Sequence, residues 1–290
     1  MTLPVLPLFV EEELGGTKLE VGIAVSSFGI AAAFIRPFIG PLGDLRGRRT
    51  LVVGGSIVAG LATLATALAD SIGAVIAIRA VTGVGEAAVF VGVASSIQDL
   101  ASDDRRAEAA SYFSLTIYGT LLVAPLIGGW LRDEYSTDTV WMVAGGLALG
   151  AAVFGVTASG RPPTATPFPP ARRLIHPAAV RPGLMLFSGL LGYTGFLAFA
   201  VIHAEEVGIA DGERIFVVFG AVVITLRLVA ARVPDRLGPL RTTRLSLTSG
   251  VTGLLILFAW QEPVGAYVGA AVLAVAQTFL FPALFALVVD

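Results

Sequence analysis

The sequence lacks cysteine entirely, has only two histidines and carries little charge. Without cysteine, disulfides and thiolate chemistry are excluded, and His176 and His203 are too far apart to give metal-site spacing. Only 14% of the residues are charged, whereas 56% are hydrophobic and the mean hydropathy is +0.85. A single soluble core cannot bury so much apolar surface in 290 residues, so the composition indicates an integral membrane protein.

Long apolar runs recur along the chain, with polar breaks between them. A bilayer core of about 30 Å takes roughly 20 apolar residues in a helix, and the runs have this length. We therefore predict an all-α, polytopic membrane helix bundle with about nine full transmembrane helices and one partial helix. The full spans are expected at 21–43, 50–69, 72–97, 109–131, 138–158, 183–204, 214–233, 244–261 and 264–289.

The first apolar segment, MTLPVLPLFV, is too short to span a bilayer. Its ten residues, at 1.5 Å each, reach about 15 Å, which is roughly half of a bilayer core. A secretory signal is the alternative, but no basic region and no small-residue cleavage site comes before the glutamates at 11–13. The segment therefore fits the second half of a transmembrane helix.

Basic residues gather in alternate connections between the predicted spans. The thirteen on one side are Arg46, Arg48, Arg49, Arg105, Arg106, Arg161, Arg172, Arg173, Arg181, Arg232, Arg236, Arg241 and Arg244. The other side has only Lys18, Arg132 and Arg214, beside many acids. The positive-inside rule places the first set in the cytoplasm and predicts a multi-pass protein of the cell membrane.

The longest break, 161–182, is rich in proline and arginine, which disfavour both helix and bilayer. We predict that it is a cytoplasmic linker between an N-terminal bundle, 1–160, and a second bundle, 183–290. Six spans, counting the partial first one, precede this linker, and four follow it.

The two predicted bundles are weakly repeated in sequence. At an offset of 191 residues, Phe28 aligns with Phe219 and Arg36 with Arg227. The same offset aligns GDLRG with PDRLG, which pairs Asp44 with Asp235 and Gly47 with Gly238. After a two-residue gap, FVEEELG at the start of the chain resembles HAEEVG in the second bundle. Two homologous bundles are typical of transporters that rock one half against the other around a central site.

Four charged residues lie inside predicted spans, namely Arg36, Arg79, Glu86 and Arg227. A carboxylate well inside an apolar run, such as Glu86, is costly and is by default a functional group. Arg79 precedes it by seven residues, so both lie on one helix face about two turns apart. We predict proton or substrate coupling here, with a static polar clamp as the alternative. Arg36 and Arg227 are expected to snorkel to the interface or to pair with acids there.

The bend between the second and third spans resembles a motif of the major facilitator superfamily, G-x-L-A-D-R-x-G-R-[KR]. The matching residues are Gly40, Leu42, Gly43, Asp44, Gly47, Arg48 and Arg49, and the degenerate second copy is Asp235, Arg236 and Gly238. The resemblance implies two six-helix halves and a cytoplasmic gate in which this motif latches the halves together. A simple topological stop with a tight turn is the alternative.

Two further segments carry the resemblance. TLLVAPLIGG is similar to the helix-five motif of proton-coupled antiporters in Pro125, Gly128 and Gly129, and LPVLP resembles the helix-one signature of the twelve-helix drug efflux branch. Arg79 matches a helix-four arginine of the family, whereas Glu86 matches no family motif. Against a twelve-helix family, the chain is expected to be truncated at both ends, lacking the first half of helix one and helices eleven and twelve.

From these features we predict transmembrane transport of a small molecule by alternating access, with proton-coupled efflux as the preferred form. Uptake of a metabolite and a non-transporting membrane fragment or partner protein are the alternatives. No paired catalytic carboxylates, nucleophile with a base, phosphate loop or metal cluster is found, so an enzyme is not predicted. The expected partners are a small-molecule substrate, protons and the lipid bilayer. No cofactor and no nucleic acid are expected, and the oligomeric state is not predicted.

Overall fold

The computed structural model describes residues 1–102, 106–157, 180–230 and 233–289, and this part of the chain forms helices and their connections. The elements of the first part are α1 (Thr2–Leu8), the π-helix η1 (Phe9–Glu13), α2 (Lys18–Arg46), α3 (Arg48–Thr66), α4 (Ile72–Leu100), α5 (Arg106–Glu134) and α6 (Thr137–Gly155). Those of the second part are α7 (Val180–Glu206), α8 (Arg214–Val229), α9 (Val233–Leu237), α10 (Pro239–Ala259) and α11 (Pro263–Val289). The all-α prediction is confirmed.

Each predicted full span coincides with one of these helices. Seven of the described helices are long and apolar enough to cross a membrane by length and composition, namely α2, α3, α4, α6, α7, α10 and α11. The helix α8 has only 16 residues, because it ends at Val229 rather than at the predicted residue 233. The partial first span is the short α1 followed by η1.

Local sequence explains where two of the long helices begin. Thr17 and Glu20 form a capping box at the start of α2, in which the Thr17 hydroxyl accepts from the Glu20 backbone N–H and the Glu20 carboxylate accepts from that of Thr17. Ser136 caps α6 in the same way by accepting from the backbone N–H of Thr139. These caps fix the helix ends on the side of the bundle that also holds η1.

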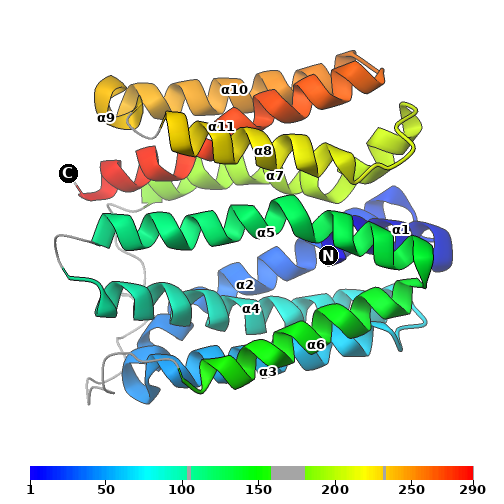
Figure 1. The fold of residues 1–290 in the computed structure, drawn as a ribbon, viewed down its shortest axis with the longest axis horizontal. Helices are drawn as coiled ribbons and strands as arrows, with labels where there is room; N and C mark the ends of the chain where they lie inside the picture. The colour runs from blue at the N-terminus through cyan, green and yellow to red at the C-terminus, as the bar shows by residue number, and fades with distance from the viewer. Residues whose placement is uncertain (103–105, 158–179, 231–232, 290) are drawn as a thin grey trace.

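The helices form two packed groups that lie on opposite sides of α5 in Figure 1. In the first group, α3 packs against α4 and α6, and α4 packs against α2. In the second group, α11 packs against α7, α8 and α10. The groups meet where α5 contacts α8 and where α1 and α2 contact α7. The predicted linker between them, 161–182, lies almost entirely outside the described residues.

Backbone geometry supports the sequence repeat. The only described residues with positive φ are four glycines: Gly15 (64°), Gly47 (87°), Gly208 (94°) and Gly238 (79°). Gly47 and Gly238 are aligned by the offset of 191 residues, and each is the N-cap of the next long helix. Gly15 and Gly208 are the aligned glycines of FVEEELG and HAEEVG. Because L-residues with side chains rarely adopt this conformation, the repeat preserves two turns that glycine makes possible.

The main hydrophobic core lies at one end of the bundle and joins both groups. It includes Val21 of α2, Val75 of α4, Trp141 of α6, Phe196 of α7 and Phe219 of α8. These residues lie on the halves of their helices that adjoin η1 and the acids around it, so we name this the acidic end. The opposite end, with the bend at residues 44–48, is named the arginine-rich end. The second core cluster lies there and draws only on α2, α3 and α4.

Candidate functional site

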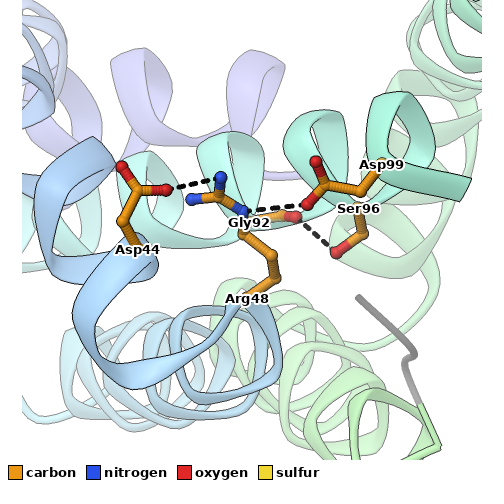
Figure 2. Close-up of polar contacts among 5 residues, drawn as sticks. All are labelled: Asp44, Arg48, Gly92, Ser96 and Asp99. Atoms are coloured by element: carbon orange, nitrogen blue, oxygen red, sulfur yellow. Dashed lines mark hydrogen bonds and ion pairs between the residues drawn. The ribbon is translucent and has the colours of Figure 1, made fainter. Parts of the chain in front are cut away.

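The motif at the arginine-rich end is organised by Arg48. Figure 2 shows its guanidinium between two carboxylates, with Nη2 2.7 Å from Asp44 Oδ1 and Nε 3.3 Å from Asp99 Oδ2. Asp44 belongs to α2, Arg48 begins α3 and Asp99 lies in the last turn of α4. The Arg48 side chain is only 14% exposed. One arginine therefore ties three helices together at the bend.

Glycines make room for this arrangement. Gly47 has a φ of 87° and forms the turn, while a Cβ at Gly43 would come within 2.9 Å of Arg48 Nη1. One turn before Asp99, the buried Ser96 hydroxyl donates to the carbonyl of Gly92, which satisfies this hydroxyl within α4 (Figure 2). The other predicted members, Gly40 and Arg49, contribute less, since a Cβ at Gly40 meets nothing within 4 Å and Arg49 is exposed.

The second copy of the motif is described only in part. Gly238 repeats the positive-φ turn and Arg236 is exposed on the short α9, whereas the Asp235 side chain lies outside the described part. Asp99 was not singled out from the sequence, because an aspartate near a helix end is common on any protein surface. Its spacing could have identified it, because Asp99 lies one turn after Ser96, which is buried on the face of α4 that packs against α3.

Inside the spans, the structure pairs Glu86 with Arg36 rather than with Arg79. Arg36 Nη2 lies 3.5 Å from Glu86 Oε2, and the two side chains are 46% and 36% exposed. The Arg36 guanidinium also lies over the Phe90 ring, 5.0 Å from its centroid. The sequence led us to expect that Arg36 snorkels to the interface or pairs with acids there, whereas the acid beside it, Glu86, lies on α4 within the apolar span.

Arg79 has a different environment from the one its spacing suggested. Its residue is 9% exposed and its guanidinium lies over the Phe28 ring, 4.6 Å from the centroid. Gly83, one turn further along α4, allows this approach, because a Cβ there would overlap the Phe28 backbone. Arg79 therefore binds the face of an aromatic ring on α2. Arg227 lies in the last turn of α8, with its Nε buried.

The helix-five residues are closely packed, and one of them, Gly129, forms a contact between the two groups. Gly128 lies against Met1, where a Cβ would overlap the backbone, and Pro125 is buried. A Cβ on Gly129 would come within 2.7 Å of the Glu213 carboxylate, which belongs to the N-cap of α8. Glycine at position 129 thus allows a buried carboxylate of the second group to pack on α5.

Charged residues surround this contact at the acidic end. Lys18 of α2 pairs with Glu206 of α7 at 2.5 Å, and Arg132 of α5 pairs with Glu12 at 2.5 Å. Glu213 is 7% exposed, and its burial, with the repulsion from Asp133, raises the pKa of this carboxyl group. Sequence reasoning missed Glu213, because it read the acids on this side only as a guide to orientation.

No group of three or more potential metal ligands is found in the described ranges. A bundle of membrane-length helices in two repeated groups, with charged side chains inside the spans, has the architecture of a secondary transporter. Comparison with known proteins makes the assignment specific. The model of the Major Facilitator Superfamily matches residues 1–290, so the chain belongs to this superfamily of membrane transporters. It is a multi-pass membrane transport protein and not an enzyme.

Relatives and solved structures agree with this assignment. An uncharacterised MFS-type transporter of Salmonella typhimurium is 28% identical over 292 aligned residues, which cover 97% of this chain and 74% of the relative. The crystal structure of the nucleoside transporter NupG (D323A mutant) matches with a TM-score of 0.77 at 14% identity, covering 97% of this chain and 76% of that one. A structure of the peptide transporter POT (E310Q mutant), with bound alafosfalin, gives 0.73 at 17% identity, covering 97% and 76%. At these identities the structures establish the fold alone.

Proposed function

We propose that this transporter exports a small molecule in exchange for protons, with Glu86 as the proton-binding group. The observation that carries the proposal is the Arg36–Glu86 pair. Its atoms lie 3.5 Å apart and both side chains are partly exposed within apolar spans. An ionised carboxylate within an apolar span is costly, so we infer that Glu86 binds and releases a proton during transport. Arg36 stabilises the carboxylate form, and proton uptake by Glu86 frees Arg36 for another partner.

The unequal ends of the bundle support the proposal of alternating access. The main core joins the two groups at the acidic end, whereas the second core cluster draws on the first group alone. At the same end, the Lys18–Glu206 ion pair and the packing of Glu213 on Gly129 add polar contacts between the two groups. By the positive-inside rule the arginine-rich end is cytoplasmic, so this conformation is closed to the outside. The cytoplasmic placement of the linker 161–182 belongs to the same proposal.

The latch that the motif provides acts at the other end. Arg48 holds Asp44 and Asp99 together within the first group, so the three helix ends move as one body when the groups rock. The second copy supplies only the glycine turn and the exposed Arg236 within the described residues. The charge network that the structure describes therefore lies on the first group.

The test uses the full chain in proteoliposomes. A counterflow panel first identifies a solute, and an imposed pH gradient then drives its flux. Glu86→Gln should keep expression and solute counterflow but lose the response to the gradient, while Glu134→Gln, at an exposed acid, should behave as the unmodified protein. If Glu86→Gln retained full pH-driven flux, the assignment of Glu86 would be wrong. The sign of the flux relative to the gradient distinguishes export from uptake.

A further inference from the structure

The start of α10 has one buried face and one exposed face. Thr242, Thr243 and Ser246 are buried, whereas Leu240 and Leu245 are 55% and 56% exposed. Exposed arginines alternate with these leucines, and the short α9 before them adds one more residue of each kind. We name the exposed set the Arg–Leu corner, and it consists of Arg236, Leu237, Leu240, Arg241, Arg244 and Leu245.

The two parts of the Arg–Leu corner meet at the Gly238 turn. Gly238 has a φ of 79° and joins α9 to α10, and α9 packs against both α10 and α11. Figure 1 shows α9 beside the start of α10. The corner therefore lies at the arginine-rich end, which the positive-inside rule places at the cytoplasmic surface of the membrane.

The positive charge of the corner is not neutralised within the described part of the chain. None of its three arginines forms an ion pair with a carboxylate that the structure describes, whereas Arg48 at the same end lies between two carboxylates. The offset of 191 residues aligns Arg241 with Thr50 and Arg244 with Val53. These two cations are thus not part of the sequence repeat, and the bend motif does not account for them.

Exposed arginines beside exposed leucines match the chemistry of a membrane amphiphile. A guanidinium binds a phosphate group through two parallel hydrogen bonds, while leucine side chains at the same helix end contact acyl chains. From Leu240 to Leu245, α10 rises by roughly 8 Å, which is comparable to the boundary between headgroups and acyl chains. The cytoplasmic leaflet carries anionic lipids, which basic clusters at this surface attract. A free phosphate would use the arginines but not the leucines.

We propose that the Arg–Leu corner binds an anionic phospholipid of the cytoplasmic leaflet. Arg241 and Arg244 hold its phosphate, and Leu240 and Leu245 contact its acyl chains. The bound lipid anchors the second group of helices to this leaflet through the start of α10. This interaction requires neither proton coupling nor a particular direction of transport, so it is independent of the assignment of Glu86.

The test measures which lipids gather beside α10 when the full chain is held in nanodiscs. The cysteine-free sequence allows Thr248→Cys, at an exposed position one turn past Arg244, to carry a bimane fluorophore. Phosphatidylglycerol and phosphatidylcholine, each with a nitroxide on an acyl chain, are compared as quenchers at equal mole fraction. Phosphatidylglycerol should quench more strongly. Arg241→Gln with Arg244→Gln should abolish this preference, with about a fivefold loss of relative affinity for each arginine.

Two matched variants separate a site from general attraction to the membrane. Arg46→Gln with Arg49→Gln removes the same charge at the same end, but from exposed positions on the first group, and should leave the preference at the α10 probe unchanged. Leu240→Ser with Leu245→Ser keeps the charge and should weaken the preference, because the contact with the acyl chains is lost. Added glycerol phosphate should not compete, since it lacks these chains.

Several results would overturn the proposal. It fails if the two lipids quench equally, or if the preference survives the loss of Arg241 and Arg244. It fails as well if the first-group variant abolishes the preference, if the serine variant leaves it unchanged, or if glycerol phosphate displaces the lipid. A probe at Gln261→Cys, exposed at the acidic end of the same helix, gives the last comparison, because an equal preference there would show that no site exists at the Arg–Leu corner.

Discussion

Arg48 shows how one residue at a helix junction can hold three helices. Its two carboxylate partners differ in exposure, since the Asp44 side chain is 49% exposed and that of Asp99 is 19% exposed. Exposed ion pairs contribute little to stability, whereas loss of a shielded charged hydrogen bond costs more. The Asp99 contact should therefore dominate, although it was Asp44 that the sequence motif singled out.

This difference gives a prediction for two matched variants. Asp99→Asn should lower the free energy of unfolding by about 2 kcal/mol, while Asp44→Asn should cost at most about 1 kcal/mol. Thermal melts of both variants in the same detergent, followed by intrinsic fluorescence, compare them directly. An equal loss, or a larger one for Asp44→Asn, would mean that the network is not organised around the shielded partner.

Glu213 leads to a prediction about pH. Burial raises the pKa of this carboxyl group, so the folded protein binds its proton more tightly than the unfolded chain does. Its contribution is therefore most favourable at low pH and is lost as the pH rises through the raised pKa. Asp133 and Asp211 oppose the ionised form and Arg132 favours it.

The expected result is that the unfolding midpoint of Glu213→Gln exceeds that of the unmodified protein at pH 8, with the difference shrinking toward pH 5. The measurement is a series of thermal melts across this range. Glu134→Gln serves as the control because Glu134 is exposed at the same end of the bundle. A difference that does not change with pH would contradict a titrating Glu213.

At this scale the sequence led to some residues of the site and missed others. The bend motif identified Asp44, Gly47 and Arg48 because glycines and charged residues clustered between two apolar runs indicate a tight polar turn. It could not give the partner of Glu86, because spacing along one helix favours Arg79, whereas the nearest arginine lies on a different helix. Glu213 was missed for a related reason, since only the packing of α8 on α5 reveals its burial.

The helices themselves were the most predictable elements, because an apolar run of bilayer length has few folded alternatives. Their number and order follow from hydropathy, and the start of α2 follows from its capping residues. Helix pairing was not predictable in the same way. It depends on which faces approach closely, as where Gly85 of α4 meets Ala59 of α3.

Close approach also yields a prediction. A Cβ on Gly85 would come within 2.6 Å of the α3 backbone, whereas one on Gly54 of α3 would meet nothing within 4 Å. Gly85→Ala should thus destabilise the protein by about 1–3 kcal/mol through overpacking. Gly54→Ala should be neutral or slightly stabilising, by up to about 1 kcal/mol, because alanine favours helix over glycine. Detergent thermal melts of the pair test this, and similar midpoints would mean that α4 can move away from α3 at little cost.

At the scale of the whole molecule, two groups of helices share a core at one end and repeat each other's glycine turns. The weak sequence repeat indicated the matching turns, since Gly47 and Gly238 align at the offset of 191 residues. It did not reveal which end the groups share. That depends on buried contacts from several helices at once, such as Phe196 and Phe219 of the second group meeting Val21 and Val75 of the first in one cluster.

The central claim is that the two groups rock, so that one end opens as the other closes. The cysteine-free sequence allows spin labels to be placed without removing native thiols. One labelled pair, at Lys18 and Glu206, reports on the acidic end, and another, at Arg49 and Arg236, reports on the arginine-rich end. All four residues are exposed, although labelling the first pair removes the Lys18–Glu206 ion pair.

The most direct test is to measure both distance distributions by double electron–electron resonance in nanodiscs while the pH changes from 5 to 8. The account predicts opposite changes, in which a fraction of molecules gains distance across the acidic end and a matching fraction loses distance across the arginine-rich end. Glu86→Gln should abolish both changes. Distances that stayed fixed at both ends, or that lengthened at both ends together, would contradict alternating access by rocking.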